Sequence, residues 1–241
     1  MRQIDYRGIF TLSWFNEPLA DKSILNYIVK AKQYCPDSYI RLNSNGDYLT
    51  RDYLDELNQA GLSEILVTLH MDCGENYTDE LAKKKLDLFF KKIGMEYSIT
   101  RMISGHNVSC DLTYKGIRFL VVTNNWKVDG NDRGGEISSL SINNRMSPCV
   151  IPFREVYIDV EGNMRFCCNI FVNGSNIANI KNHDIVDAFF SDEMVEIRRN
   201  LFVFGPKAGP CTTCSSSDNA SPSSKDQREK LLATNVKFIH R

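Results

Sequence analysis

Four cysteines in the last third of the sequence have the residue type and spacing of a metal site. Cys211 and Cys214 form a CxxC pair, whose two thiolates can bind one metal centre. Cys167 lies on the second strand of an expected hairpin, and Cys149 lies just before the first strand of that hairpin. Four thiolates from three segments suit either a 4Fe–4S cluster or a zinc ion. The spacing alone does not choose between these two centres.

A fifth thiol, Cys168, directly follows Cys167. Because successive side chains on a strand point to opposite faces, only one of the two is expected to face the shared site. Cys35, Cys73 and Cys110 are isolated, and we expect them to act as small apolar side chains in the protein interior. No secretory apolar segment is seen near the N-terminus, so we expect a cytoplasmic protein. In such a reducing compartment, clustered cysteines indicate metal or redox chemistry.

The composition is that of an ordinary globular protein. Of the 241 residues, 42% are hydrophobic and 24% are charged, and the formal net charge is −1. No apolar run approaches the ~18 residues that a membrane helix needs. The near-neutral charge gives no electrostatic reason to expect a nucleic acid or an anionic membrane as a partner. The sequence therefore favours a protein that binds neither.

Strand-like and helix-like segments alternate over the first half of the chain. Capping residues precede the three expected helices, which begin after Asp21, Thr50 and Thr78, and Gly61 and Gly94 end the last two. The expected strands are residues 8–12, 39–42, 65–69, 97–102 and 117–122. This alternation predicts a parallel sheet with helices on its outer side. Active sites in such sheets lie at the carboxyl ends of the strands.

The second half is built differently. Residues 127–148 are polar and rich in Gly and Asn, and they are predicted to form a connector. Residues 155–160 and 164–167 predict a hairpin with Gly162 in its turn. A helical stretch is expected from Asp184 to Leu201. The segment after residue 214 is rich in Ser, Asp and Asn, which is typical of a mobile tail.

The cysteine spacing resembles a known family. Cys149, twelve residues, Gly162, four residues and Cys167 are similar to the opening of the SPASM domain, an auxiliary cluster module of radical S-adenosylmethionine (radical SAM) enzymes. No cysteine follows Cys214, so the segment is similar to the shorter twitch domain, which holds one cluster. The resemblance favours iron–sulfur over zinc. It also implies that Cys167, rather than Cys168, is the ligand.

The first half agrees with this resemblance. After the first strand, the run from Asn16 to Leu19 resembles the family's GGEP motif, which contacts the amino group of S-adenosylmethionine, and Glu17 supplies the carboxylate. Polar residues occupy other places where the family contacts this cosubstrate, namely Ser44, Asn45, Thr68, Ser98 and Arg101. Arg133 resembles an Arg-Gly element near the family's substrate and is the candidate catalytic residue. For each of these positions, a polar residue that ends a strand or a surface turn is the structural alternative. His70, at a strand end, has the same two interpretations.

The resemblance implies a fold and a reaction. The fold is α/β, with a partial (β/α)6 radical SAM barrel over residues 1–126 and a connector over 127–148. A small twitch/SPASM-like domain with one auxiliary 4Fe–4S cluster follows over 149–214, and a tail over 215–241. The implied function is an oxidoreductase that uses a 5′-deoxyadenosyl radical to abstract hydrogen. Its substrate is a sugar, aminocyclitol or peptide, and its electron donor is a flavodoxin or ferredoxin.

One element of the family is missing from this sequence. Radical SAM chemistry needs a CxxxCxxC loop, in which three thiolates hold a cluster with one open iron, and no such motif occurs in the 241 residues. We expect either that an open frame upstream of Met1 encodes it or that the protein is a degenerate relative. The alternative function is a non-catalytic iron–sulfur or zinc module, or a partner of a complete radical SAM protein.

Overall fold

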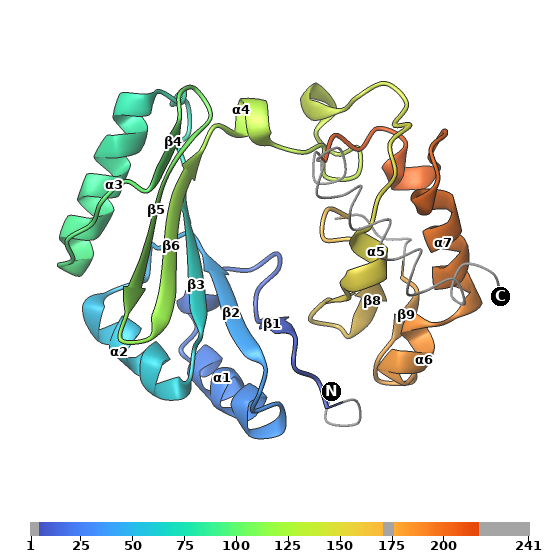
Figure 1. Ribbon diagram of the computed structural model, residues 1–241, viewed down its shortest axis with the longest axis horizontal. Helices are drawn as coiled ribbons and strands as arrows, with labels where there is room; N and C mark the ends of the chain where they lie inside the picture. Colours follow the sequence, from blue (N-terminus) through green and yellow to red (C-terminus); the bar gives the residue numbers. More distant parts are fainter. Residues whose placement is uncertain (1–4, 171–175, 217–241) are drawn as a thin grey trace. The chain divides into compact units, whose positions relative to one another are not determined.

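The computed structural model describes residues 5–170 and 176–216 of the chain. The chain divides into two compact units, Met1–Asp129 and Gly130–Arg241 (Figure 1). Each unit has its own hydrophobic core. In the described residues, no helix has both the length and the apolar character needed to cross a membrane.

A six-stranded mixed sheet forms the centre of the first unit. Its strands lie in the order β1 (Ile9–Thr11), β2 (Tyr39–Ser44), β3 (Glu64–Leu69), β6 (Ile117–Asn124), β5 (Asn107–Tyr114) and β4 (Arg101–Ile103). The first four of these are parallel neighbours. The last two continue the sheet as antiparallel strands. The unit is therefore a mixed α/β structure with a parallel centre.

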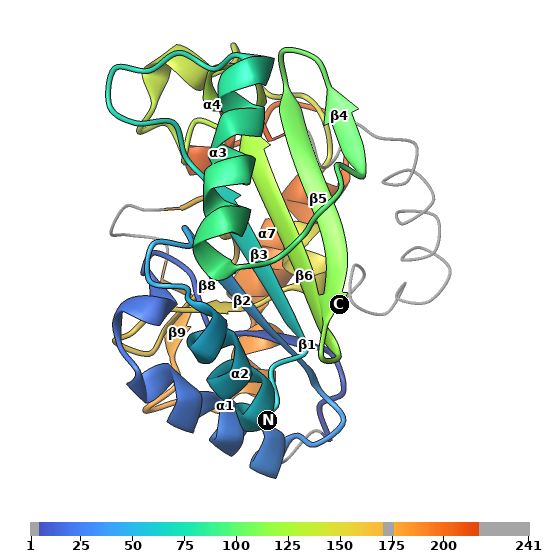
Figure 2. The same ribbon diagram turned by 90° about the vertical axis from the view of Figure 1, so that its left-hand side faces the viewer.

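Three helices cover one face of this sheet, as the views in Figures 1 and 2 show. They are α1 (Ser23–Tyr34), α2 (Arg51–Ala60) and α3 (Asp79–Ile93), and the short α4 (Trp126–Asp129) follows β6. The expected caps of α2 and α3 are confirmed, because the hydroxyls of Thr50 and Thr78 accept the N–H of Tyr53 and Leu81 at 3.1 Å. Gly61 and Gly94 end these helices in the left-handed conformation.

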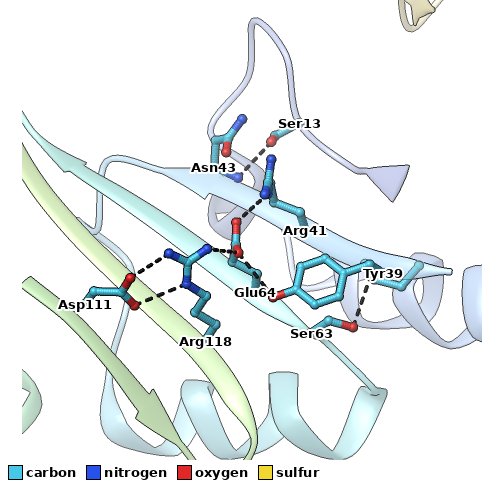
Figure 3. Close-up of polar contacts among 9 residues, drawn as sticks. Ser13, Tyr39, Arg41, Asn43, Ser63, Glu64, Asp111 and Arg118 are labelled. Atoms are coloured by element: carbon cyan, nitrogen blue, oxygen red, sulfur yellow. Dashed lines mark hydrogen bonds and ion pairs between the residues drawn. The ribbon is translucent and has the colours of Figure 1, made fainter. Parts of the chain in front are cut away.

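The two faces of β3 differ in chemistry, because side chains alternate along a strand. Ile65, Val67 and Leu69 are buried in the core under the helices. Glu64 and Thr68 point to the opposite face. There, buried Glu64 accepts hydrogen bonds from Tyr39 and Arg118, both at 3.1 Å, and also pairs with Arg41 (Figure 3). This charged network links β2, β3 and β6 near the start of their parallel run.

The second unit is a small α+β module. It contains α5 (Ile151–Arg154), a three-stranded sheet of β7 (Tyr157–Ile158), β8 (Asn163–Arg165) and β9 (Ala178–Asn179), and the helices α6 (Ile185–Phe189) and α7 (Asp192–Phe202). The predicted hairpin is confirmed, with Tyr157 opposite Arg165 and Ile158 opposite Met164.

Gly162 is required in the turn of this hairpin for two reasons. Its φ of +89° lies in the left-handed region that favours glycine. A Cβ at this position would also meet Asn179 at 3.2 Å and Ile180 at 3.3 Å. The glycine of the cysteine spacing is therefore explained by backbone conformation together with the close approach of the third strand.

Three expectations for the elements need correction. Residues 97–100 do not form a strand, and the strand β4 begins only at Arg101. It pairs antiparallel with β5, a strand that the sequence analysis does not predict. The single helix expected from Asp184 to Leu201 is two helices, since Ser191 accepts the N–H of Met194 and starts α7 anew. Strand β8 ends at Arg165, so Cys167 lies just beyond the strand. The expected tail lies outside the described residues after residue 216.

Candidate functional site

The four cysteines of the predicted metal site line one pocket of the second unit. The pocket has about 310 Å³ of empty space, part of it open to solvent. Cys149 and Cys167 are buried, and Cys211 and Cys214 are half-buried. The remaining walls are largely apolar, with Ile151, Pro152, Phe166 and Leu201, and the polar Arg145, Asn169 and Ser216 complete the lining. Three separate segments of the chain thus bring their thiols to one place.

Local structure constrains the segments that carry Cys149, Cys167 and Cys211. The N–H of Cys149 donates to the carbonyl of Leu201 at 2.7 Å, which ties the segment before α5 to the end of α7. The Sγ of Cys167 accepts the N–H of Asn169 at 3.4 Å. Cys211 ends a short 3-10 turn, Gly209–Cys211, in which Pro210 stiffens the backbone.

Cys168 has different surroundings from its neighbour. It does not line the pocket, and its Sγ lies 3.7 Å from the Oδ1 of Asn169. A hydrogen bond with Cys168 and burial both raise the pKa of the Cys167 thiol. Burial also raises the pKa of Tyr157, and Cys168 and Glu155 raise it further. The fifth thiol therefore lies against Cys167, Tyr157 and Glu155, and it is not part of the pocket lining.

The donor set fits an iron–sulfur cluster. Burial raises the pKa of Cys211 to about 12, and the neighbouring Cys214 and Cys149 add to this effect. Thiolates are the ligands that iron–sulfur clusters use, and the binding of the metal displaces the thiol protons. In the described part of the chain, no group of three or more Cys, His, Asp or Glu side chains has the arrangement of a metal-ion site. The fit rests on the pocket that the four cysteines share.

The turn that carries Arg133 packs against the cysteine segments. Arg133 has a φ of +52°, a conformation that a non-glycine residue rarely adopts. A Cβ on the next residue, Gly134, would lie 3.3 Å from Pro210 and 3.5 Å from the carbonyl of Asn169. The structure therefore places Arg133 in the second unit, close to the segments that follow Cys167 and precede Cys211.

Two residues that sequence reasoning missed anchor these segments. Asp132 is fully buried, and its Oδ2 accepts the hydroxyl of Thr213 at 2.7 Å, which ties the Arg133 turn to the CxxC pair. Arg145 is a buried cation whose Nη1 donates to the Sγ of Cys214 at 3.0 Å. Both lie in the polar stretch that was assigned to a connector, and isolated polar residues in such a stretch carry no periodic signal.

The structure brings together three of the predicted cosubstrate residues of the first unit. Glu17 Oε1 accepts the N–H of Leu19 at 3.0 Å and the hydroxyl of Ser44 at 2.8 Å. Its Oε2 accepts the N–H of Asn45 at 2.7 Å. Glu17 therefore caps the 3-10 turn Pro18–Ala20 and also holds the carboxyl end of β2.

The other predicted cosubstrate residues are spread across the sheet. Asn16 is exposed and accepts the N–H of Trp14 at 2.9 Å. Thr68 lies on β3, on the face opposite the helices. Ser98 and Arg101 are exposed and lie before and at the start of β4, the edge strand farthest from β1. At about 4.8 Å per strand, β4 lies roughly 19 Å along the sheet from β2. Arg101 is therefore not part of the Glu17 cluster.

His70 contacts Trp126 within the first unit. Its Nδ1 accepts the indole N–H of Trp126 at 3.1 Å, and the two rings are stacked with centroids 5.9 Å apart. Burial lowers the pKa of His70. This contact supports the structural interpretation of the residue, because a neutral imidazole is needed to accept the indole N–H.

Comparisons with known proteins agree with this architecture. Residues 149–215 match the family model of SPASM, an iron–sulfur cluster-binding domain. The chain is 21% identical over 236 residues to the S-adenosyl-L-methionine-dependent 2-deoxy-scyllo-inosamine dehydrogenase of Niallia circulans, a match that spans 96% of this chain and 81% of that protein.

Two crystal structures of BtrN are also similar to this chain. The complex with AdoMet and 2-DOIA has a TM-score of 0.62 and 20% identity, and covers 83% of this chain and 69% of BtrN. The open conformation has a TM-score of 0.54 and 17% identity, with 83% and 67% covered. The fold is therefore similar to that of BtrN. Together with the SPASM match, these findings confirm the expected resemblance to radical SAM proteins that carry a SPASM-type domain.

Proposed function

We propose that this chain is an iron–sulfur protein of the radical SAM oxidoreductase type, with one auxiliary 4Fe–4S cluster held in the second unit. The ligands are Cys149, Cys167, Cys211 and Cys214. The observation that carries the proposal is the pocket that these four thiols line, which lies within the segment matched by the SPASM model. Four thiolates are the usual ligand set of a 4Fe–4S cluster.

The reaction follows from the chemistry of the dehydrogenase relative. In a protein that also held a radical-initiating cluster, dehydrogenation of an alcohol carbon would transfer one hydrogen atom to a 5′-deoxyadenosyl radical and would then release one proton and one electron. When bound, an oxidised auxiliary cluster supplies an acceptor for that electron. The proposed substrate class is a sugar, an aminocyclitol or a peptide, and Arg133 is the proposed substrate contact. A flavodoxin or ferredoxin is the proposed electron donor.

The first unit offers a place for the ammonium of S-adenosylmethionine. An ionised carboxylate has about four acceptor positions. Within the described part of the chain, Glu17 uses three of them, two on Oε1 and one on Oε2. The remaining position on Oε2 suits an ammonium, and the three internal bonds hold the carboxylate in a fixed orientation for it.

The lack of a CxxxCxxC motif in this sequence favours a second candidate function. The 241-residue sequence has eight cysteines but no CxxxCxxC, so it does not supply the three thiolates of a radical-initiating cluster. In this alternative, the chain is a non-catalytic iron–sulfur module that works with a complete radical SAM protein. Both functions require the same auxiliary cluster.

Anaerobic reconstitution tests the proposal. The purified chain is incubated with ferrous iron and sulfide, desalted, and analysed for bound iron, sulfide and zinc. We expect about four irons and four sulfides per chain, and a cluster spectrum by electron paramagnetic resonance (EPR) after reduction with dithionite. A chain that retains one zinc ion and no iron under these conditions contradicts the proposal.

A further inference from the structure

Arg145 contacts the proposed cluster site directly. The residue is 2% exposed, and its guanidinium lines the cysteine pocket. Its Nη1 donates to the Sγ of Cys214 at 3.0 Å and to the carbonyl of the same residue at 3.3 Å. On the other side, Nη2 donates to the carbonyl of Pro148 at 3.2 Å, and Nε to that of Ser147 at 3.3 Å. Arg145 therefore joins the segment that leads into Cys149 to the end of the CxxC pair.

The buried positive charge of Arg145 would be stabilised by an anion in the pocket. Among the described residues, all its side-chain hydrogen-bond acceptors are carbonyl oxygens or sulfur. An arginine stays protonated in proteins, and a buried positive charge is costly without a negative partner. Four thiolates around a 4Fe–4S core leave a net negative charge, which meets this need.

We infer that Arg145 raises the reduction potential of the auxiliary cluster by donating an N–H···S hydrogen bond to Cys214 and by placing a fixed positive charge beside it. Reduction adds one electron to the cluster and hence one negative charge. A nearby cation and a hydrogen-bond donor on sulfur both stabilise that reduced state more than the oxidised one. No proton moves, since the guanidinium stays protonated throughout. The inference rests on the proposed function, because it requires the cluster to be present.

The same unit contains a matched control. Arg198 is also 2% exposed, and its Nε donates to the carbonyl of Pro152 at 2.9 Å. Its guanidinium lies 4.0 Å from the centroid of the Phe189 ring, and it does not line the cysteine pocket. Replacing Arg198 removes a buried arginine of equal exposure without removing a contact to a ligand thiol.

The test compares four reconstituted proteins: the parent, Arg145→Gln, Arg145→Lys and Arg198→Gln. Iron and sulfide are counted first, and the midpoint potential is then measured by an EPR-monitored titration with dithionite and mediator dyes. We expect Arg145→Gln to shift the midpoint potential to a more negative value. Arg145→Lys should shift it less, because lysine keeps the positive charge but lacks the planar guanidinium with its fixed N–H donors. Arg198→Gln is expected to match the parent.

The outcomes separate this inference from the proposed function. A parent chain that binds no cluster contradicts the proposed function itself. A parent that holds the cluster, with an unchanged potential in the Arg145 variants, overturns only the role of Arg145. An equal shift in Arg198→Gln also overturns it, because the effect then follows from the loss of any buried arginine. If Arg145→Gln fails to hold iron, the midpoint potential of the Arg145→Lys cluster is compared with that of the parent. A more negative potential in Arg145→Lys supports the inference, and an unchanged potential refutes it.

Discussion

The adjacent thiols of Cys167 and Cys168 have different surroundings in this structure. Cys167 lines the pocket with Cys149, Cys211 and Cys214, whereas Cys168 lies beside Asn169 and outside the lining. We expect Ala at any of the four pocket cysteines to abolish the bound cluster, because each removes a ligand. Cys168→Ala should retain most of the iron. Iron and sulfide counts after anaerobic reconstitution check this, and loss of iron from Cys168→Ala but not from Cys167→Ala would reverse the assignment.

His70 gives a pH-dependent contact with Trp126. Because burial lowers its pKa, the unfolded chain takes up the proton more readily than the folded one, so stability falls as pH drops below the ordinary value of about 6.5. Protonation also removes the acceptor of the indole N–H. In a Trp14→Phe background, Trp126 fluorescence should titrate with a midpoint below about 6.5. His70→Gln should abolish that titration, and a midpoint above 6.5 would contradict the lowered pKa of His70.

At the scale of elements, the hairpin between β5 and β6 depends on a two-residue turn. Lys115 and Gly116 have φ values of +46° and +94°, as a type I′ turn requires. A Cβ on Gly116 would meet no heavy atom within 4 Å, so Gly116→Ala tests conformation alone. We expect a loss of about 1–2 kcal/mol in the free energy of unfolding, measured with urea. Gly116→Asn should lose less, because Asn tolerates this conformation, and an unchanged urea midpoint for Gly116→Ala would contradict the argument.

Local chemistry explains which elements were predictable from the sequence. The helices that begin after Thr50 and Thr78 and end at Gly61 and Gly94 were predicted because their caps are formed by neighbouring residues. Strand β5 was overlooked, although residues 107–114 alternate polar and apolar side chains and lead into Lys115-Gly116. The antiparallel edge of the sheet follows from the two short turns before and after β5, which leave no room for a helix.

The site was predictable only in part, because some of its residues act through contacts between distant segments. The cysteine types and spacing indicated a shared centre, and the structure brings the four thiols to one pocket. Asp132 and Arg145, by contrast, act through long-range contacts to Thr213 and Cys214. A single arginine or aspartate in a Gly/Asn-rich stretch looks like a solvated turn, and only the packing of distant segments shows that it is buried.

For the whole molecule, the absence of CxxxCxxC from the sequence sets the expected chemistry. We expect the 241-residue chain, reconstituted and given dithionite and S-adenosylmethionine, to yield no 5′-deoxyadenosine. The four pocket thiols saturate their cluster and leave no open iron to bind the cosubstrate. Chromatography of the quenched reaction checks this, with a complete radical SAM enzyme as the positive control. Stoichiometric 5′-deoxyadenosine from clean protein would contradict it.

Because the two units have separate cores, loss of the cluster is expected to lower the local stability of the second unit and not of the first. Cys149 and Cys167 are part of the buried core of the second unit, with Met164, Phe166 and Leu201. The core of the first unit contains none of the four ligands. Metal that binds only the folded site adds its binding free energy to the stability of that site.

Removing the iron with a chelator and an oxidant should therefore increase amide hydrogen exchange around residues 145–170 and 200–214. Strands β2, β3 and β6 should keep their protection, because their core lacks a ligand and local unfolding follows cooperative units. Mass spectrometry of the exchanged protein before and after removal measures both regions in one experiment. The Cys168→Ala chain, stripped in the same way, is the control and should behave like the parent. Equal loss of protection in both units would show that they unfold as one, and unchanged exchange near the cysteines would show that the cluster does not stabilise this fold.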